Sequence, residues 1–205
     1  MQSSARRAPV RRTAIVLALP VAAGLALGGC GVNTIPTKEE AAKAAWAQVE
    51  NQYQRRADLI PNLVSTVQGY AKQEKDVLVG VTQARASASA IHLSGDDLKD
   101  PGKVAAYEQA QNHVSVALGQ LRPLQEAYPD LKSNANFMAL QSQLEGTENR
   151  ITIARQDYNG AVQDYNTTIR TFPALIGAKV IYGAKPLVPF KATTVNAQVA
   201  PTVKF

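Results

Sequence analysis

Residues 137–172, FMALQSQLEGTENRITIARQDYNGAVQDYNTTIRTF, decide the fold of this 205-residue chain. Apolar and small residues recur in this stretch at alternating intervals of three and four positions. The recurring positions are Phe137, Leu140, Leu144, Thr147, Ile151, Ala154, Tyr158, Ala161, Tyr165, Thr168 and Phe172. A stripe of this period, held over about five heptads, predicts a long helix packed lengthwise against another helix. Pro173 follows the stripe and should end the helix.

A second stripe of the same period lies in the first half of the chain. It comprises Leu63, Val67, Tyr70, Glu74, Val77, Val81, Ala84, Ala88 and Ile91. Upstream of it, Thr37 and Glu40 form a capping box, so a helix is expected to begin there. Pro61 predicts a kink or a brief interruption. The alternative is an unbroken helix over residues 38–92, about 80 Å long at about 1.5 Å per residue.

Residues 94–102, SGDDLKDPG, predict a loop between this region and the next helix. Asp100 and Pro101 are placed as the N-cap and the first residue of that helix, because proline needs no hydrogen-bond acceptor at this position. Pro123 should bend its last turns, and residues 127–130 predict a turn. The next helix is the one carried by the stripe over residues 137–172.

The pattern as a whole predicts an all-α, elongated antiparallel bundle, with four helices as the working number and an extended C-terminal tail. Residues 37–184 form the bundle, within which residues 174–182 predict a short helix. Residues 185–205 contain three prolines and many β-branched residues, so they are expected to be extended.

The N-terminus resembles an export signal. Four arginines precede an apolar run over residues 13–27, and small residues lead to Cys30, the only cysteine of the chain. Leu27 to Cys30 resembles a bacterial lipobox, so residues 1–29 are interpreted as a signal peptide and 30–36 as a lipidated cysteine and spacer. The alternatives are an uncleaved membrane-spanning anchor and plain secretion. All three place the helical body outside the cytoplasm.

Charge and motifs exclude several function classes. Without the four N-terminal arginines, 18 basic residues face 16 acidic ones, and this balance gives no basis for nucleic-acid binding. No nucleophile elbow, phosphate loop or dinucleotide fingerprint occurs, so no catalytic residue or cofactor is assigned. His92 and His113 flank the 94–102 loop but lack metal-ligand spacing, and no metal site is expected.

One polar face is a candidate for interaction or for fixing helix register. The triplet Asp-Tyr-Asn occurs twice, one heptad apart, so both copies lie on the same side of the helix. A structural interpretation buries both tyrosines in the seam, with their hydroxyls bound to a partner group. The sharper hypothesis pairs Arg55 or Arg56 with Asp157 or Asp164. The full face comprises Arg55, Arg56, Asp58, Asn62, Asp157, Tyr158, Asn159, Asp164, Tyr165 and Asn166.

Two long segments resemble the LemA family. They are residues 48–75, QVENQYQRRADLIPNLVSTVQGYAKQEK, and residues 128–173, YPDLKSNANFMALQSQLEGTENRITIARQDYNGAVQDYNTTIRTFP, and the closing PTVKF is also similar. The resemblance implies a bacterial envelope protein with an antiparallel four-helix bundle on an N-terminal membrane anchor. It supplies no biochemical mechanism. The Gly-Gly-Cys sequence before the bundle departs from the transmembrane anchor of many members.

The sequence therefore predicts a non-enzymatic, membrane-anchored scaffold of the bacterial cell envelope. We expect its partners to be membrane lipid through Cys30 and either an envelope protein or a second copy of the chain, because long heptad-patterned surfaces suit helix association. The first alternative is a periplasmic module that binds a small molecule in a bundle cavity. The second is an envelope hydrolase, which would need converging acids or histidines in a pocket.

Overall fold

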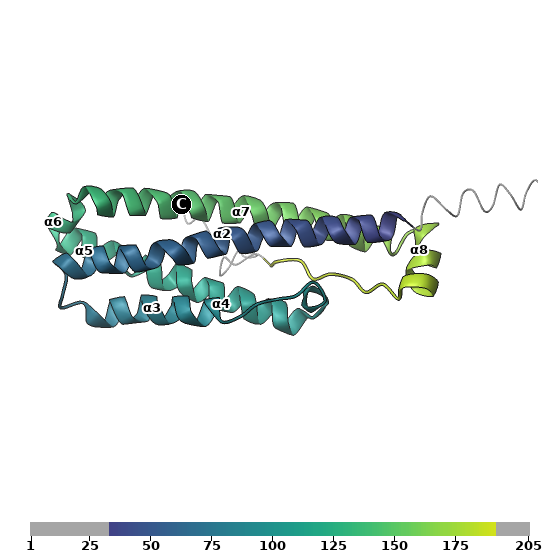
Figure 1. Ribbon diagram of the computed structural model, residues 1–205, viewed down its shortest axis with the longest axis horizontal. Coiled ribbons are helices and arrows are strands. Elements are labelled where there is room, and N and C mark those ends of the chain that lie inside the picture. Colours follow the sequence, from purple (N-terminus) through teal and green to yellow (C-terminus); the bar gives the residue numbers. More distant parts are fainter. Residues whose placement is uncertain (1–32, 192–205) are drawn as a thin grey trace, which may run out of the picture.

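The computed structural model describes residues 33–191, and all regular secondary structure within that range is helical. Two long helices, α2 (Thr34–Tyr70) and α7 (Ala135–Thr168), lie side by side along most of the molecule (Figure 1). Two shorter helices, α3 (Lys75–Ser89) and α4 (Pro101–Gly119), lie beside the half that contains the C-terminal end of α2. The predicted all-α, elongated bundle is confirmed.

Short elements connect these helices and close the two ends of the bundle. They are η1 (Asp97–Lys99), α5 (Arg122–Ala127), α6 (Pro129–Lys132), α8 (Ala174–Gly177) and the π-helical turn η2 (Ala178–Tyr182). Helices α5 and α6 lie at one end, and α8 lies at the other end, beside the start of α2 (Figure 1). From there, residues 183–191 run back along the bundle without regular secondary structure.

Helix α4 begins as the sequence predicts, whereas α2 does not. The Asp100 carboxylate accepts hydrogen bonds from the backbone N–H groups of Gly102 and Lys103, at 2.8 and 3.3 Å. Helix α2, however, begins at Thr34, and the Thr37 hydroxyl donates to the carbonyl of Asn33 at 2.8 Å. The prediction that Thr37 and Glu40 cap the start of this helix is therefore wrong. The helix can begin earlier because Pro36 lies in its first turn, where backbone N–H groups have no helical acceptor.

Pro61 does not interrupt α2, which continues to Tyr70. A proline inside a helix leaves the carbonyl four residues earlier without its usual donor. Here that carbonyl belongs to Ala57, and the Nε–H of Arg85 on α3 donates to it at 2.7 Å. The side chain of a neighbouring helix thus replaces the hydrogen bond that Pro61 cannot make.

The chain reverses direction at residues 71–74 instead, so the unbroken helix over residues 38–92 is wrong. Leu63 and Val67 before the turn and Val81 and Ala88 after it are all buried. The seven-residue period continues across the turn because both helices direct their apolar stripes to the same core. Pro123, likewise, lies in the first turn of the separate helix α5 rather than bending α4.

The buried apolar side chains form two clusters along the bundle. One contains the aromatic residues Trp46, Tyr53, Tyr107, Tyr158 and Phe190, whose neighbouring ring centroids lie 5.2–5.7 Å apart. The other lies toward α5 and α6 and is mainly aliphatic. Most of the α7 stripe is buried as predicted, but α7 ends at Thr168. Its last predicted position, Phe172, is 79% exposed.

Candidate functional site

The repeated Asp-Tyr-Asn triplets bind the extended segment that follows η2. The Nδ2 of Asn166 donates to the carbonyl of Leu187 at 2.8 Å, and its Oδ1 accepts from the N–H of Leu187 at 2.9 Å. Asn159 makes the same pair of hydrogen bonds with Phe190, at 3.1 and 2.8 Å. We call these two side chains and the residues that they hold the asparagine clamp.

The spacing of the clamp follows from the geometry of its two elements. Seven residues of α-helix rise about 10.5 Å, and three residues of extended chain span about 10 Å. Asparagines one heptad apart can therefore bind residues three apart, as Leu187 and Phe190 are. Both of these apolar side chains are buried in the aromatic cluster, so the segment contributes to the core.

The two tyrosines of the triplets support the same segment. The hydroxyl of Tyr158 donates to the carbonyl of Val188 at 2.9 Å, and that of Tyr165 donates to the carbonyl of Lys185 at 3.2 Å. Both residues are fully buried, and burial raises the pKa of each phenol. The structural interpretation of the triplets, buried rings with bound hydroxyls, is confirmed.

The end of the segment is held by two residues that the sequence analysis missed. The Arg155 guanidinium donates to the carbonyl of Lys191 at 2.9 Å and lies over the Phe190 ring, 4.6 Å from its centroid. The Glu108 carboxylate on α4 accepts from the N–H of Lys191 at 3.0 Å and from Arg155 at 3.2 Å. Arg155 lies one helical turn before Asn159, so both side chains lie on the same face of α7.

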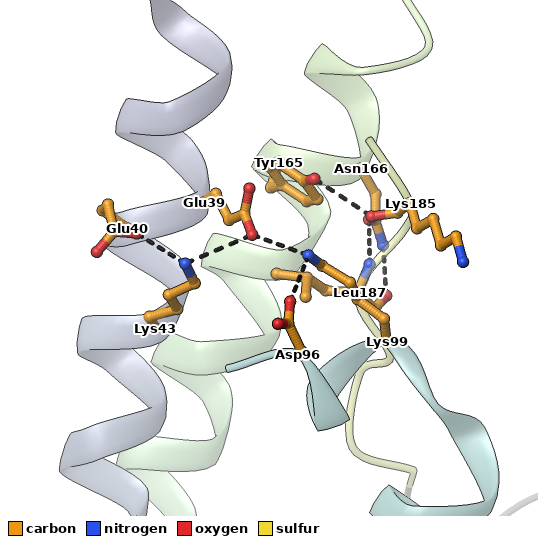
Figure 2. A network of polar contacts seen from close by, with 9 residues as sticks. All are labelled: Glu39, Glu40, Lys43, Asp96, Lys99, Tyr165, Asn166, Lys185 and Leu187. Atoms are coloured by element: carbon orange, nitrogen blue, oxygen red, sulfur yellow. Dashed lines mark hydrogen bonds and ion pairs between the residues drawn. The ribbon is translucent and has the colours of Figure 1, made fainter. Parts of the chain in front are cut away.

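Ion pairs surround the start of the clamp (Figure 2). Lys99 of η1 contacts Glu39 of α2 at 3.1 Å and Asp96 at 3.0 Å, and Lys43 contacts Glu40 at 2.8 Å. Figure 2 places these charges beside Tyr165, Asn166 and Leu187. The pair of Lys99 with Glu39 joins α2 to the loop before α4. Such partly exposed pairs contribute modestly to stability.

The remaining residues of the predicted polar face are not brought together. Lys38 pairs with Asp164 at 2.9 Å, whereas Arg56 pairs with Glu148 at 2.6 Å. Within residues 33–191, neither Arg55 nor Arg56 forms an ion pair with Asp157 or Asp164. The register hypothesis is therefore wrong in its partners.

The α2 portion of that face lies too far along the bundle to meet the triplets. In the antiparallel α2–α7 pair, Arg56 lies level with Glu148, while the triplets lie level with the beginning of α2. Asp58 accepts a hydrogen bond from Gln54 of its own helix at 2.7 Å, and Arg55 and Asn62 are exposed.

Arg56 is instead the centre of a polar layer between the two apolar clusters. Its side chain is only 2% exposed, and its guanidinium donates to Ser115 and to the carbonyl and side-chain oxygens of Gln111 on α4. The ion pair with Glu148 joins the same group to α7. One arginine thus connects α2, α4 and α7. We define the polar layer by the buried residues Arg56, Gln111 and Thr147.

An open groove lies between α4 and α7, beyond the polar layer. Its volume is about 540 Å³. The lining is mainly apolar, with Leu63, Leu118, Leu121, Phe137 and Leu144, and its polar residues are Ser115, Arg122, Gln125, Gln141, Glu145 and Glu148. The side-chain oxygen of Gln141 is a buried acceptor for which the described residues provide no donor. We call this feature the α4–α7 groove.

A smaller cavity beside the polar layer is lined by several titratable side chains. It is lined by Glu50, Arg85 and His92 among others and holds about 60 Å³, enough for one or two water molecules. Burial raises the pKa of Glu50. Within residues 33–191, no three His, Cys, Asp or Glu side chains converge as metal ligands.

The predicted lipidation site, Cys30, lies outside the described residues. Between residues 33 and 191, no helix has both the length and the apolar character that a membrane span requires.

Comparisons with known proteins identify similar chains. A family model described as LemA family matches residues 45–205. Two proteins of Paramagnetospirillum magneticum, magnetosome proteins MamQ 1 and MamQ 2, are each 28% identical over 183 residues, which is 82% of this chain and 67% of theirs. Magnetosome protein MamQ of Magnetospirillum gryphiswaldense is 26% identical over the same shares of the two chains.

Proposed function

This chain belongs to the LemA family, and from that premise we propose that it is a membrane-tethered, non-enzymatic scaffold of the bacterial envelope. Its α4–α7 groove receives the apolar face of a helix from a partner protein. The relatives support a role of this kind, because the names of the MamQ proteins assign them to a cellular structure and not to a reaction.

The observation that carries this proposal is the groove itself. Two antiparallel helices line an apolar channel, and an amphipathic helix can place residues spaced three and four apart into such a channel. Leu118 and Leu144 are partly exposed and offer apolar contacts along it.

The position of the groove suits a tethered scaffold. Cys30 precedes the start of α2 by four residues, and Leu63 lies 29 residues along that helix. At about 1.5 Å per residue, the groove is held about 44 Å from the anchored end. A diacylglyceryl group on Cys30 would supply the tether, and intact-mass analysis of protein extracted from its host measures that modification.

A small molecule is the second candidate occupant. The groove volume of about 540 Å³ lies within the range of about 300–1,000 Å³ typical of ligand pockets. A mainly apolar compound would fit the lining. The two functions can be told apart by blocking the groove. Blocking it would abolish contact with a partner protein in one case and binding of a compound in the other.

Gly119 offers a way to block the groove without disturbing the fold. It lines the groove, and a Cβ built there would meet no atom within 4 Å. Gly119→Trp should therefore fill the rim while the melting temperature changes little. Gly69→Trp is the matched control, because Gly69 is also exposed on a helix with open space around it but does not line the groove.

A photoreactive residue at Leu118 tests the occupant in intact host cells. We expect one dominant protein adduct at Leu118, absent at the neighbouring exposed position Val116. The adduct should disappear with Gly119→Trp and persist with Gly69→Trp. A compound that co-purifies with the unsubstituted protein and is lost with Gly119→Trp would instead establish the small-molecule function. Equal crosslinking at Leu118 and Val116 would contradict the scaffold.

A further inference from the structure

Five large apolar side chains are exposed on one short stretch of the chain. Phe172 and Val180 are each 79% exposed, and Ile181, Ile176 and Tyr182 are 62%, 58% and 44% exposed. All five belong to the corner formed by α8 and η2 and the turn before it. We call these five residues the apolar tip. Contiguous exposed apolar groups on a soluble surface mark a contact with a partner or with lipid.

The apolar tip lies at the end of the bundle from which the anchor segment leaves. Figure 1 shows α8 beside the start of α2, and the two helices are in contact. Only three residues separate Cys30 from Thr34, where α2 begins. A bundle anchored through that segment therefore has its apolar tip next to the bilayer surface.

Charge around the apolar tip favours an anionic surface. Arg170, Lys179 and Lys185 lie on or beside the corner, and the sequence contains no aspartate or glutamate after Asp164. The two carboxylates at the start of α2, Glu39 and Glu40, are already paired with lysines. Basic residues next to exposed apolar side chains are typical of segments that lie in the interface of an anionic membrane.

We propose that the apolar tip inserts into the headgroup region of the membrane to which the chain is anchored. The orientation rests on the proposed tether, whereas the insertion rests on the exposed side chains. By analogy with interfacial helices, the apolar groups should lie about 5–10 Å inside the boundary with the acyl chains. Two contacts with the bilayer, the anchor and the apolar tip, fix the tilt of the bundle, whereas one contact alone would leave the tilt free to change.

A second copy of the chain is a less suitable partner for this surface. In a symmetric contact the same patch faces itself, so the cations of one copy would face those of the other. The cations of two facing copies would repel each other, whereas the phosphates of an anionic bilayer attract these cations.

Tryptophan quenching in the full-length protein tests the insertion. Val180→Trp places an indole on the apolar tip. Met138→Trp, at a position 50% exposed in the first turn of α7, is the matched control. The native Trp46 is only 3% exposed and gives a constant background. The proteins are reconstituted from host membranes into vesicles of phosphatidylcholine and phosphatidylglycerol, with or without brominated acyl chains.

Brominated lipid should remove roughly half or more of the emission added by Val180→Trp, because an indole at the interface lies within reach of the acyl chains. It should leave the emission added by Met138→Trp unchanged. Replacing phosphatidylglycerol with phosphatidylcholine should reduce the quenching. Vesicle flotation reports separately on the tether: flotation without quenching at position 180 overturns the inference and leaves the tether intact. A concentration-dependent blue shift of position 180 without lipid, and no quenching with it, overturns the inference in favour of self-association.

Discussion

At the scale of single residues, the carbonyl of Ala57 decides whether α2 remains one helix. Pro61 removes the donor that this carbonyl would have, and an unsatisfied carbonyl at the partly buried contact with α3 would cost about 1–3 kcal/mol. Arg85 supplies the replacement from α3 at 2.7 Å. The proline therefore contributes to the packing of two helices without breaking either of them.

A double-mutant cycle measures this replacement. We expect Arg85→Ala to lower the free energy of unfolding by about 1–2 kcal/mol in the natural sequence. In the Pro61→Ala background, Arg85→Ala should lower the free energy of unfolding much less, because the new backbone N–H at position 61 donates to the carbonyl of Ala57. Urea unfolding of the four proteins gives the coupling free energy. If Arg85→Ala lowered the free energy of unfolding equally in both backgrounds, the hydrogen bond to Ala57 would not be the cause of the loss.

The sequence alone could not resolve Pro61 or identify the partner of Arg56. The donor to Ala57 comes from Arg85, 28 residues further along, and becomes a neighbour only after the chain reverses at residues 71–74. Glu148, the ion-pair partner of Arg56, is 92 residues away. Helical periodicity places residues on faces but does not define which levels of two antiparallel helices meet.

At the scale of elements, the asparagine clamp predicts a local effect on the segment that it binds. Asn166→Ala removes both hydrogen bonds to Leu187, at a cost of about 1–3 kcal/mol for the stability of the bound segment. We expect the Leu187 amide to exchange its hydrogen much faster, while amides in the middle of α2 and α3 remain protected. Hydrogen exchange measured by mass spectrometry compares the two.

Gln163→Ala is the control for this substitution. Gln163 lies on the same helix within one turn of Asn166, but it is exposed and makes no hydrogen bond to the segment. Its replacement should leave the exchange at Leu187 unchanged. If Asn166→Ala also left it unchanged, the segment would be held by the burial of Leu187 and Phe190 and not by the asparagine.

The sequence predicted the elements better than it predicted their ends. The alternating stripe identified α7, and the acid-proline pair at residues 100–101 identified the start of α4. The reversal at residues 71–74 escaped prediction because AKQE contains neither glycine nor proline, and the stripes on both sides are in phase. The triplets were interpreted correctly as buried tyrosines, but nothing local indicated that the flanking asparagines bind residues 187 and 190.

At the scale of the whole molecule, the polar layer joins two apolar clusters that would otherwise meet directly. Arg56 donates to α4 and α7 from α2, so its removal leaves partners on two helices without a donor. Arg56→Ala should lower the free energy of unfolding by about 3 kcal/mol, because the buried oxygens of Gln111 lose their charged donor and a cavity replaces the arginine side chain. Urea unfolding followed by circular dichroism measures the change.

Arg55→Ala provides the matched control in the same helix. Arg55 is exposed, and surface substitutions of this kind change stability by about 0.5 kcal/mol or less. Comparable losses for the two alanine variants would argue that the effect at Arg56 comes from helix propensity or net charge. A loss confined to Arg56→Ala assigns it to the polar layer.

The elongated bundle follows from the sequence, whereas its two candidate contact surfaces do not. Periodicity predicted that long helices pair, but the α4–α7 groove depends on how α4, α5 and α7 are placed relative to one another, which periodicity does not define. The apolar tip was hidden for a different reason. Phe172 continued the stripe in phase, and only the end of α7 at Thr168 turns it outward.

Two asparagines seven residues apart on α7 bind two residues three apart in the extended segment. This spacing limits which sequence changes the region tolerates. The asparagine clamp recognises main-chain groups, so exposed side chains of the segment, such as Pro189, are open to replacement. One inserted or deleted residue between Leu187 and Phe190, by contrast, shifts the chain by about 3.3 Å, further than a hydrogen bond can stretch. Homologous chains should therefore vary in amino-acid identity between the two clamped residues, while the number of residues between them stays constant.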